Sequence, residues 1–202
     1  MRTFVYMPGK AKVLGSKEIQ IVLKVLKTHR DKLLFAVGLY TGLRISEIIA
    51  IKMSDVFTTS GGVRNTLKIT RLKKKNTVYS NIPIHPKLRE QLASYKDLLD
   101  AQDQDDSTYS PSPWLFPSTD NPESHIGRIR AHNILTEAFD SVNIEGASTH
   151  SMRRTCLTNM SRAGIPLRTI QEISGHSNLG QLQEYLAVDP ADSHKAIMSL
   201  KY

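Results

Sequence analysis

Residues at five positions carry side chains that could act together on a phosphate ester. His150 and Arg153 stand three positions apart, so on a helix they project from one face. His176 follows a glycine at the end of a helical run, and Tyr185 lies nine residues further along. Arg44, far upstream in the run TGLRISEI, supplies a second guanidinium. Together these residues predict a phosphate-handling site.

Such residues can cut a phosphodiester by direct attack on phosphorus. The pentacoordinate transition state carries extra negative charge on its non-bridging oxygens, and two guanidiniums can hold those oxygens bidentately. Imidazoles can donate to the same oxygens or move the proton of the nucleophile. A tyrosine nucleophile forms a covalent phosphotyrosine, which conserves the energy of the broken bond for rejoining. Electrostatic stabilisation of this kind usually carries the largest share of catalysis.

The composition is that of a basic globular protein. The chain of 202 residues has 27 Lys and Arg against 19 Asp and Glu, and this excess favours a polyanionic partner such as nucleic acid. No run approaches the roughly 18 apolar residues of a membrane helix, and the first residues lack the apolar centre of a signal peptide. We therefore expect a cytoplasmic protein with no membrane partner. Cys156, the single cysteine, falls in an apolar helical pattern and is expected to be a buried thiol.

Helical periodicity covers most of the chain. Ser16 and Thr149 are expected to cap helices, and Pro86 and Pro166 to open them. The expected helices cover residues 16–26, 32–40, 45–49, 86–99, 126–139, 149–163 and 166–174, with a final helical piece that carries Tyr185.

Two strands, at residues 67–71 and 78–84, flank the run Lys73-Lys74-Lys75-Asn76 and predict a hairpin with a basic tip. Loops are expected at residues 55–62 and 100–113. The expected fold class is α+β, mostly helical, with one small antiparallel sheet. The expected division is a basic lead-in, a single domain and a C-terminal tail, at residues 1–15, 16–189 and 190–202 respectively.

The motifs resemble those of the catalytic domain of tyrosine recombinases, also named phage integrases. TGLRISEI is similar to the family's first arginine box, which implies Arg44 as a catalytic arginine and Glu47 as its supporting acid. H-S-M-R matches the family's H-x-x-R, and S-G-H-S resembles its L-G-H-S box, which implies His150, Arg153 and His176. Tyr185 stands at the spacing of the family's nucleophile. Singly, each residue has an ordinary structural explanation; six roles in this order favour the chemistry. Arg154 could equally be the inward arginine on residue pattern alone.

The resemblance implies a hairpin lysine as the general acid. Alignment from the first strand, ITRLK, identifies Lys73 and is preferred because strand parity is better defined than loop length. Alignment backward from the second strand identifies Lys75, with Lys74 between them.

The resemblance further implies site-specific DNA recombination or integration through a 3′-phosphotyrosine, with no metal or cofactor. The expected partner is double-stranded DNA, on which four protomers assemble at two paired sites, with a monomer in solution. The tail at residues 190–202 could dock on a neighbouring subunit or on its own domain.

Two departures from the family pattern stand out. Fifteen residues precede the expected domain where family members usually carry a DNA-clamping domain of roughly a hundred residues. Ser174 stands where the family usually has an apolar residue. Three alternatives remain: a DNA-binding regulator, because residues 159–178 resemble a helix-turn-helix; a decayed recombinase; and a DNA relaxase similar to type IB topoisomerases.

Overall fold

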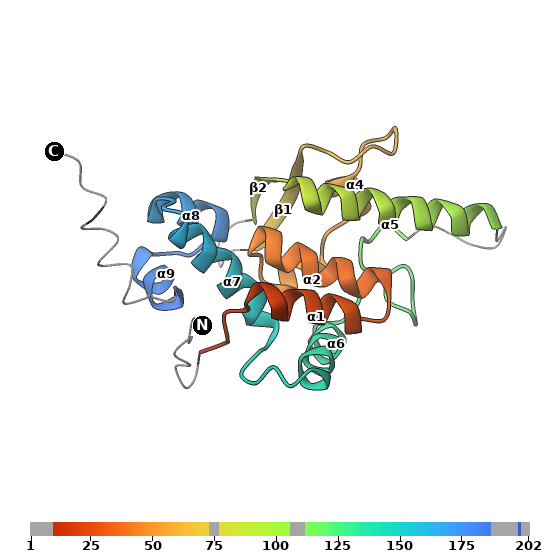
Figure 1. The fold of residues 1–202 in the computed structure, drawn as a ribbon. Helices are drawn as coiled ribbons and strands as arrows, with labels where there is room; N and C mark the ends of the chain where they lie inside the picture. The colour runs from red at the N-terminus through yellow and green to blue at the C-terminus, as the bar shows by residue number, and fades with distance from the viewer. Residues whose placement is uncertain (1–9, 73–76, 106–111, 187–197, 199–202) are drawn as a thin grey trace.

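The computed structural model describes residues 10–72, 77–105, 112–186 and 198. Within these ranges the chain forms helices and one two-stranded antiparallel sheet. Figure 1 shows the long helix α5 (Pro86–Asp105) starting next to the sheet and extending away from it, with α8 (Leu167–Ser174) and α9 (Leu179–Tyr185) gathered at the opposite end of the molecule. The predicted α+β, mostly helical class is confirmed.

Helix α2 (His29–Thr41) runs through the core next to α1 (Ser16–Val25). Six consecutive residues of α2 are buried, as expected of a helix surrounded by other elements: Leu33, Leu34, Phe35, Ala36, Val37 and Gly38. A Cβ added at Gly38 would lie 2.7 Å from Sδ of Met152 on α7 (Thr149–Arg162), closer than real Cβ atoms come. Glycine therefore permits the close contact between α2 and α7, the helix that carries two of the site residues.

Helix α2 ends at Gly42, which takes up the left-handed conformation with φ of 64°. The short helices α3 (Ile45–Ile49) and α4 (Met53–Val56) follow. The predicted loop at residues 55–62 is therefore wrong at its start. The Asp55 carboxylate accepts the backbone N–H of Lys52 at 2.9 Å and closes the first turn of α4 by capping.

Strands β1 (Thr66–Leu72) and β2 (Thr77–Pro83) pair antiparallel, from Thr66 opposite Pro83 to Leu72 opposite Thr77. The predicted hairpin is confirmed, with β1 one residue longer at each end than predicted and β2 one residue earlier in the chain. Side chains on β1 alternate between exposed and buried, and the buried register contains Leu67, Ile69 and Arg71. A charged residue thus ends an otherwise apolar inward face.

Helix α5 carries its predicted apolar stripe, with Leu88, Leu92 and Tyr95 buried. It continues to Asp105, so the predicted loop at residues 100–113 is wrong over its first six positions. The sequence AQDQD contains no Gly or Pro, and nothing in it stops a helix that is already formed.

Helix α6 (Arg128–Ser141) precedes α7, and both helices match the predicted regions. Two predicted caps are each displaced by one residue. Ser148, rather than Thr149, caps α7, because its side chain accepts the His150 N–H at 3.3 Å. Gly15, rather than Ser16, precedes α1 and donates its N–H to the Glu18 side chain.

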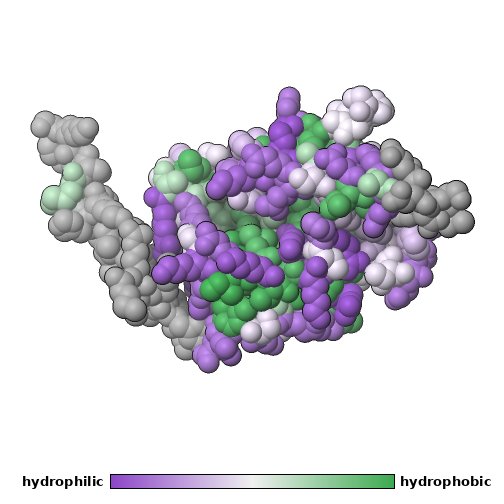
Figure 2. Space-filling view, turned by 45° about the vertical axis from the view of Figure 1, so that its right-hand side comes forward, coloured by the Kyte–Doolittle hydropathy of each residue, from purple (hydrophilic) through white to green (hydrophobic). Residues whose placement is uncertain are grey.

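The buried apolar side chains of the described residues form two clusters of very different size. The larger one draws on α1 to α7 and the sheet, whereas the smaller one contains Leu157, Ile170, Leu182 and Leu186. Figure 2 shows that apolar residues also reach the surface of one face, within a border of hydrophilic ones, as in most globular proteins. None of the described helices is long and apolar enough to cross a membrane.

Candidate active site

Arg44 stands at the N-cap of α3, directly after the turn made by Gly42 and Leu43. Its backbone N–H donates to Oε2 of Glu47 at 2.8 Å, and its Nη1 lies 3.4 Å from Oε1 of the same carboxylate. Because the Glu47 carboxylate contacts both the backbone N–H and the guanidinium of Arg44, the guanidinium is anchored on one side. Its side chain remains 42% exposed, so the other side is open to a ligand.

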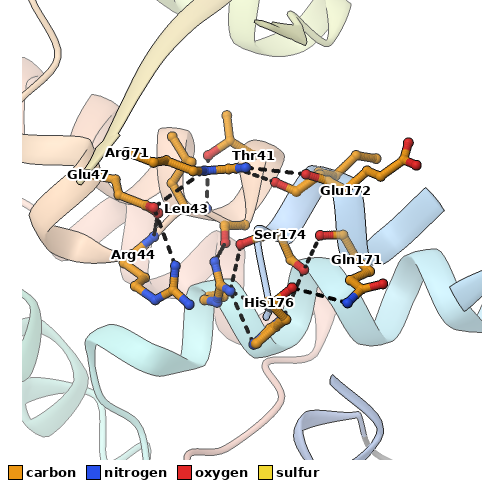
Figure 3. A network of polar contacts seen from close by, with 12 residues as sticks. Thr41, Leu43, Arg44, Glu47, Arg71, Gln171, Glu172, Ser174 and His176 are labelled. Carbon is orange, nitrogen blue, oxygen red and sulfur yellow. Dashed lines mark hydrogen bonds and ion pairs between the residues drawn. The ribbon is translucent and has the colours of Figure 1, made fainter. Parts of the chain in front are cut away.

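Glu47 also faces Arg71, as Figure 3 shows. Nε of Arg71 lies 3.5 Å from Oε1 of Glu47, and the Arg71 guanidinium donates to the carbonyl oxygens of Glu172 and Ile173 at the end of α8. Arg71 therefore connects the hairpin, α3 and α8. Gly175 follows α8 with φ of 69°, and a Cβ there would lie 2.8 Å from Nη1 of Arg71, so this close contact requires glycine.

Helix α7 presents His150 and Arg153 from adjacent turns. Arg153 is 2% exposed, and it donates from Nη1 to the carbonyl of Gly42 at 2.6 Å and from Nη2 to the carbonyl of Ser174 at 2.9 Å. These two bonds join the turn before Arg44 to the end of α8. His150 lies at the exposed start of the helix.

The His176 ring lies between Arg153 and Ser174. Its Nδ1 is 2.8 Å from Oγ of Ser174, and Nη2 of Arg153 lies 3.2 Å from Nε2 and 3.4 Å from Nδ1 of the ring. Gln171 donates from Nε2 to the backbone carbonyl of His176 at 3.2 Å. Both the ring and the backbone of His176 are therefore held by polar contacts (Figure 3).

Tyr185, the last residue of α9, directs its hydroxyl toward the start of α7. Its Oη lies 3.4 Å from Nδ1 and 3.3 Å from the carbonyl oxygen of His150. The Tyr185 ring centre is 5.5 Å from that of His176 and 5.7 Å from Cζ of Arg153. The hydroxyl thus lies near an imidazole, as a nucleophile and its base must.

The concentrated positive charge shifts the acid–base behaviour of the site. Burial, together with the neighbouring Arg153, lowers the pKa of His176 to about 4, and the same two causes lower the pKa of His150. Burial and the positive charge of Arg44 lower the pKa of Arg153 to about 10, which still leaves it charged near neutral pH. Burial raises the pKa of Tyr185, although Arg153 opposes that shift.

Arg154 points inward as well, so the two candidate arginines of α7 have different roles. Arg154 donates from Nε to the carbonyl of Tyr185 at 3.1 Å and from Nη1 to the carbonyl of Ala11. Leu14 donates its N–H to Oγ1 of Thr155 at 2.8 Å in the same region. Arg154 therefore fastens the lead-in to the end of α9, whereas Arg153 contacts His176.

The fold brings together five of the predicted catalytic positions and the supporting acid: Arg44, Glu47, His150, Arg153, His176 and Tyr185. The prediction for Lys73, and its alternatives at Lys74 and Lys75, lie outside the described residues. Cys156 is buried as predicted, and burial raises the pKa of its thiol to about 12. Among the described residues no group of three His, Cys, Asp or Glu side chains gathers as a metal site would require.

Arg71 was not predicted to contribute to the geometry, and Arg154 was named only as an alternative to Arg153. Arg71 could have been found by strand parity, because it continues the register of Leu67 and Ile69. The contacts of Arg154 with Ala11 and Tyr185 join segments far apart in sequence, and no local pattern indicates them.

Comparison with known proteins agrees with this geometry. The model of the phage integrase family matches residues 12–192. A tyrosine recombinase of Pseudothermotoga lettingae is 28% identical over 187 residues, which is 91% of this chain and 58% of that protein. Tyrosine recombinase XerA of Thermococcus onnurineus is 30% identical over 189 residues, covering 92% of this chain and 61% of the relative. This chain thus spans about three fifths of the length of these relatives.

Solved structures show the same fold. A crystal structure of XerA recombinase matches with a TM-score of 0.73 at 19% identity, over 96% of this chain and 67% of that one. The XerH site-specific recombinase bound to a palindromic difH substrate, a post-cleavage complex, matches with a TM-score of 0.71 at 19% identity, over 96% of this chain and 54% of the other. Because the family model matches nearly the whole length of this chain, the chain belongs to the phage integrase family.

Proposed function

We propose that this chain is the catalytic domain, residues 16–189, of a tyrosine-type site-specific DNA recombinase. The observation that carries the proposal is the Tyr185 hydroxyl 3.4 Å from Nδ1 of His150, beside the arginines of a basic site. Membership of the phage integrase family and the net charge of +8 support double-stranded DNA as the substrate.

Cleavage starts with attack of Tyr185 Oη on a DNA phosphorus. A bond forms between Oη and phosphorus, the bond to the 5′ oxygen breaks, and a 3′-phosphotyrosine and a free 5′ hydroxyl result. His150 accepts the phenolic proton; its lowered pKa supports this role, because the ring is neutral at neutral pH and has a free lone pair. Reversal of the same steps by another 5′ hydroxyl rejoins the strand.

The transition state gains negative charge on its non-bridging oxygens, and Arg44, Arg153 and His176 stabilise that charge. Arg44 is open on one side and anchored by Glu47 on the other, so its guanidinium is oriented before DNA arrives. Arg153 keeps its positive charge with a pKa of about 10. In this proposal the positive charge of these side chains stabilises the phosphate oxygens, a task for which other phosphotransferases use a metal ion.

Lys73 protonates the leaving 5′ oxygen in this proposal. Arg71 belongs to the buried register of β1 and contacts Glu47, and alternate residues of a strand share a face. This parity supports Lys73 over Lys74. A Lys73→Ala variant should cleave an ordinary phosphodiester poorly but regain activity on DNA with a 5′-bridging phosphorothiolate, whose sulfur leaves without a proton. Rescue seen only in Lys75→Ala would move the role to Lys75.

Four protomers assemble on two DNA sites, and the free protein is a monomer. Residues 190–202 lie outside the described part, apart from Met198, and we propose that they dock on a neighbouring subunit. Sedimentation of the chain with paired duplex sites, with and without residues 190–202, tests this. Unchanged assembly after the deletion would contradict docking between subunits.

A suicide-substrate assay tests the proposed chemistry. Nicked duplexes from a sequence library are incubated with the protein in chelator, then denatured to detect protein covalently attached to DNA. We expect an adduct that Tyr185→Phe abolishes. Tyr79→Phe is the matched control, because Tyr79 is 78% exposed on β2 and should leave the yield unchanged. Binding without an adduct in the parent protein would instead favour a DNA-binding regulator or decayed recombinase.

The helix-turn-helix alternative gains no support from packing. Ile170, Gln171 and Ser174 of α8 are buried against the rest of the chain, and Gln171 and Ser174 contact His176. In the proposed recombinase these contacts position His176, a residue of the site.

A further inference from the structure

Tyr185 stands at the end of a short helix that rests on a small apolar cluster. Helix α9 has seven residues, and the cluster beneath it contains four buried side chains. A cavity of about 400 Å³ adjoins this end of the helix, and its lining includes Ala11, His150, Arg154 and Tyr185. Apolar packing alone therefore gives the Tyr185 side chain limited support.

Arg154 adds a directional contact at the end of α9. Because Tyr185 is the last residue of the helix, its carbonyl has no partner within α9. Nε of Arg154 donates to that carbonyl at 3.1 Å. Arg154 is 7% exposed, and its Nη1 donates to the carbonyl of Ala11. One buried guanidinium thus joins the backbone of Tyr185 to the lead-in.

The described part of the lead-in is itself attached to the large core. Leu14 is 3% exposed and belongs to the larger apolar cluster. Its N–H donates at 2.8 Å to Oγ1 of Thr155, the residue after Arg154. Lys12 donates its backbone N–H to the carbonyl of Gly146, also at 2.8 Å. Arg154 therefore connects a segment fixed on the large cluster with a helix that rests on the small one.

We infer that Arg154 is a positioning residue through which residues 11–14 hold the Tyr185 hydroxyl beside His150. The lead-in is then part of the support of the site, because its displacement would release the end of α9. Tyr185 Oη lies 3.4 Å from Nδ1 of His150, and a shift of about 1 Å at a reacting group can slow a reaction about a hundredfold. The position of the Tyr185 ring can be measured without DNA, whereas the effect on cleavage rests on the proposed function.

Fluorine NMR of protein that contains 3-fluorotyrosine locates the Tyr185 ring in the absence of DNA. Tyr185→Phe identifies its signal among those of the seven tyrosines. The ring centre lies 5.5 Å from that of His176, so its chemical shift should differ from that of Tyr79, which is 78% exposed. In Arg154→Met the Tyr185 signal should move toward the shift of Tyr79. An unchanged signal would overturn the inference.

Two changes at Lys12 test the lead-in without altering α7 or α9. Lys12→Pro removes the N–H that binds Gly146, and it should move the Tyr185 signal in the same direction as Arg154→Met. Lys12→Ala keeps that N–H and removes only the ion pair with Glu18, so the Tyr185 signal should stay in place. The same Tyr185 shift in both Lys12 variants would contradict a role of the lead-in backbone.

A variant remote from the site separates positioning from general loss of stability. Thr28→Ala removes the N-cap of α2 and should lower the thermal midpoint without moving the Tyr185 signal. A displaced Tyr185 signal in Thr28→Ala would mean that any loss of stability moves the ring, and it would overturn a specific role of Arg154.

The effect on cleavage is measured with a duplex that gives an adduct in the suicide assay. At saturating DNA, Arg154→Met and Lys12→Pro should each form the adduct roughly ten- to a hundredfold more slowly. The double variant should be no slower than Arg154→Met, because both changes break one connection. Effects that multiply in the double variant would overturn the coupling. Absence of any adduct in the parent protein would refute the proposed function, while the fluorine spectra would still decide the role of Arg154.

Discussion

The two hydrophobic clusters of the described residues hold different parts of the site. The large cluster anchors α2, α3 and α6 and carries Arg44 and Glu47 on its elements. The small cluster, with four buried residues from α7 to the residue after α9, anchors the segment that carries His176 and Tyr185. The residues proposed to bind the phosphate and the proposed nucleophile thus stand on supports of unequal size.

Guanidinium–carbonyl hydrogen bonds connect these two regions. Arg71 binds carbonyls at the end of α8, Arg153 binds that of Ser174, and Arg154 binds that of Tyr185. Hydrogen bonds to charged groups each contribute about 1.5–3 kcal/mol net. The C-terminal segment is therefore positioned by directional contacts from arginines, the class of side chain proposed to bind the phosphate, more than by a core of its own.

Loss of Arg153 should have the largest effect, because this residue serves both regions. Arg153→Met leaves the buried carbonyls of Gly42 and Ser174 without a donor, at about 1–3 kcal/mol each. It also removes a donor to the transition state, which should slow adduct formation by about 10²–10³-fold. Urea unfolding and single-turnover cleavage measure the two losses. A variant that lost activity alone would show that Arg153 does not connect the two regions.

Arg44→Ala should separate catalysis from stability. Arg44 is partly exposed and its side chain contacts Glu47, so we expect the unfolding free energy to fall by less than about 1 kcal/mol. Adduct formation should still slow by about 10²–10³-fold. Arg153→Met should therefore lower the unfolding free energy more than Arg44→Ala does. Similar unfolding midpoints for the two variants would contradict the structural role given to Arg153.

Gly175→Ala should weaken the contact between Arg71 and α8. The new Cβ would lie 2.8 Å from Nη1 of Arg71, and the left-handed backbone adds strain, for a total cost of about 1–3 kcal/mol. Gly164→Ala is the matched control, because Gly164 has φ of 79° with nothing within 4 Å of the added Cβ. Equal losses of unfolding free energy would show that backbone strain alone is responsible and that the Arg71 contact is unimportant.

Hydrogen exchange should show the unequal supports directly. Amides of α8 and α9 should open locally at a free energy roughly 1.4 kcal/mol or more below that of α2, which is at least about tenfold lower protection, because few buried apolar residues hold them. Mass spectrometry of exchanged peptides compares the helices in one sample. Equal protection would mean that the C-terminal segment unfolds only with the main core.

Acid should act mainly through the C-terminal segment. The pKa of His176 is about 4 in the folded chain and ordinarily 6.5, so the unfolded chain binds an extra proton between these values. The unfolding free energy should therefore fall as pH is lowered from 6.5 to 4, and His176→Asn should flatten that slope. His150 shifts in the same direction, so part of the slope remains in the variant. An unchanged slope would contradict the depressed pKa of His176.

The site residues that belong to local sequence patterns, such as a helix end or a helical spacing, could be predicted from the sequence. Glycines at 42 and 175 mark helix ends, and the spacing of His150 and Arg153 places both on one face of α7. The predictions that were wrong concern helix boundaries, where a capping carboxylate such as that of Asp55 adds a turn that periodicity does not show.

Contacts between distant segments could not be predicted in the same way. Arg71 and Glu172 are 101 residues apart, and Arg154 and Ala11 are 143 apart, so only the folded chain brings them together. Side chains that support the site are thus harder to recognise than those that perform the chemistry.

Tyr185, the proposed nucleophile, stands on the smaller, C-terminal support. Trypsin digestion of the denaturation-resistant DNA adduct, followed by nuclease treatment and mass spectrometry, identifies the modified peptide. We predict a nucleotide remnant on the peptide of residues 169–195, in which Tyr185 is the sole tyrosine. A remnant on any other tyrosine, or on a serine, would contradict the account.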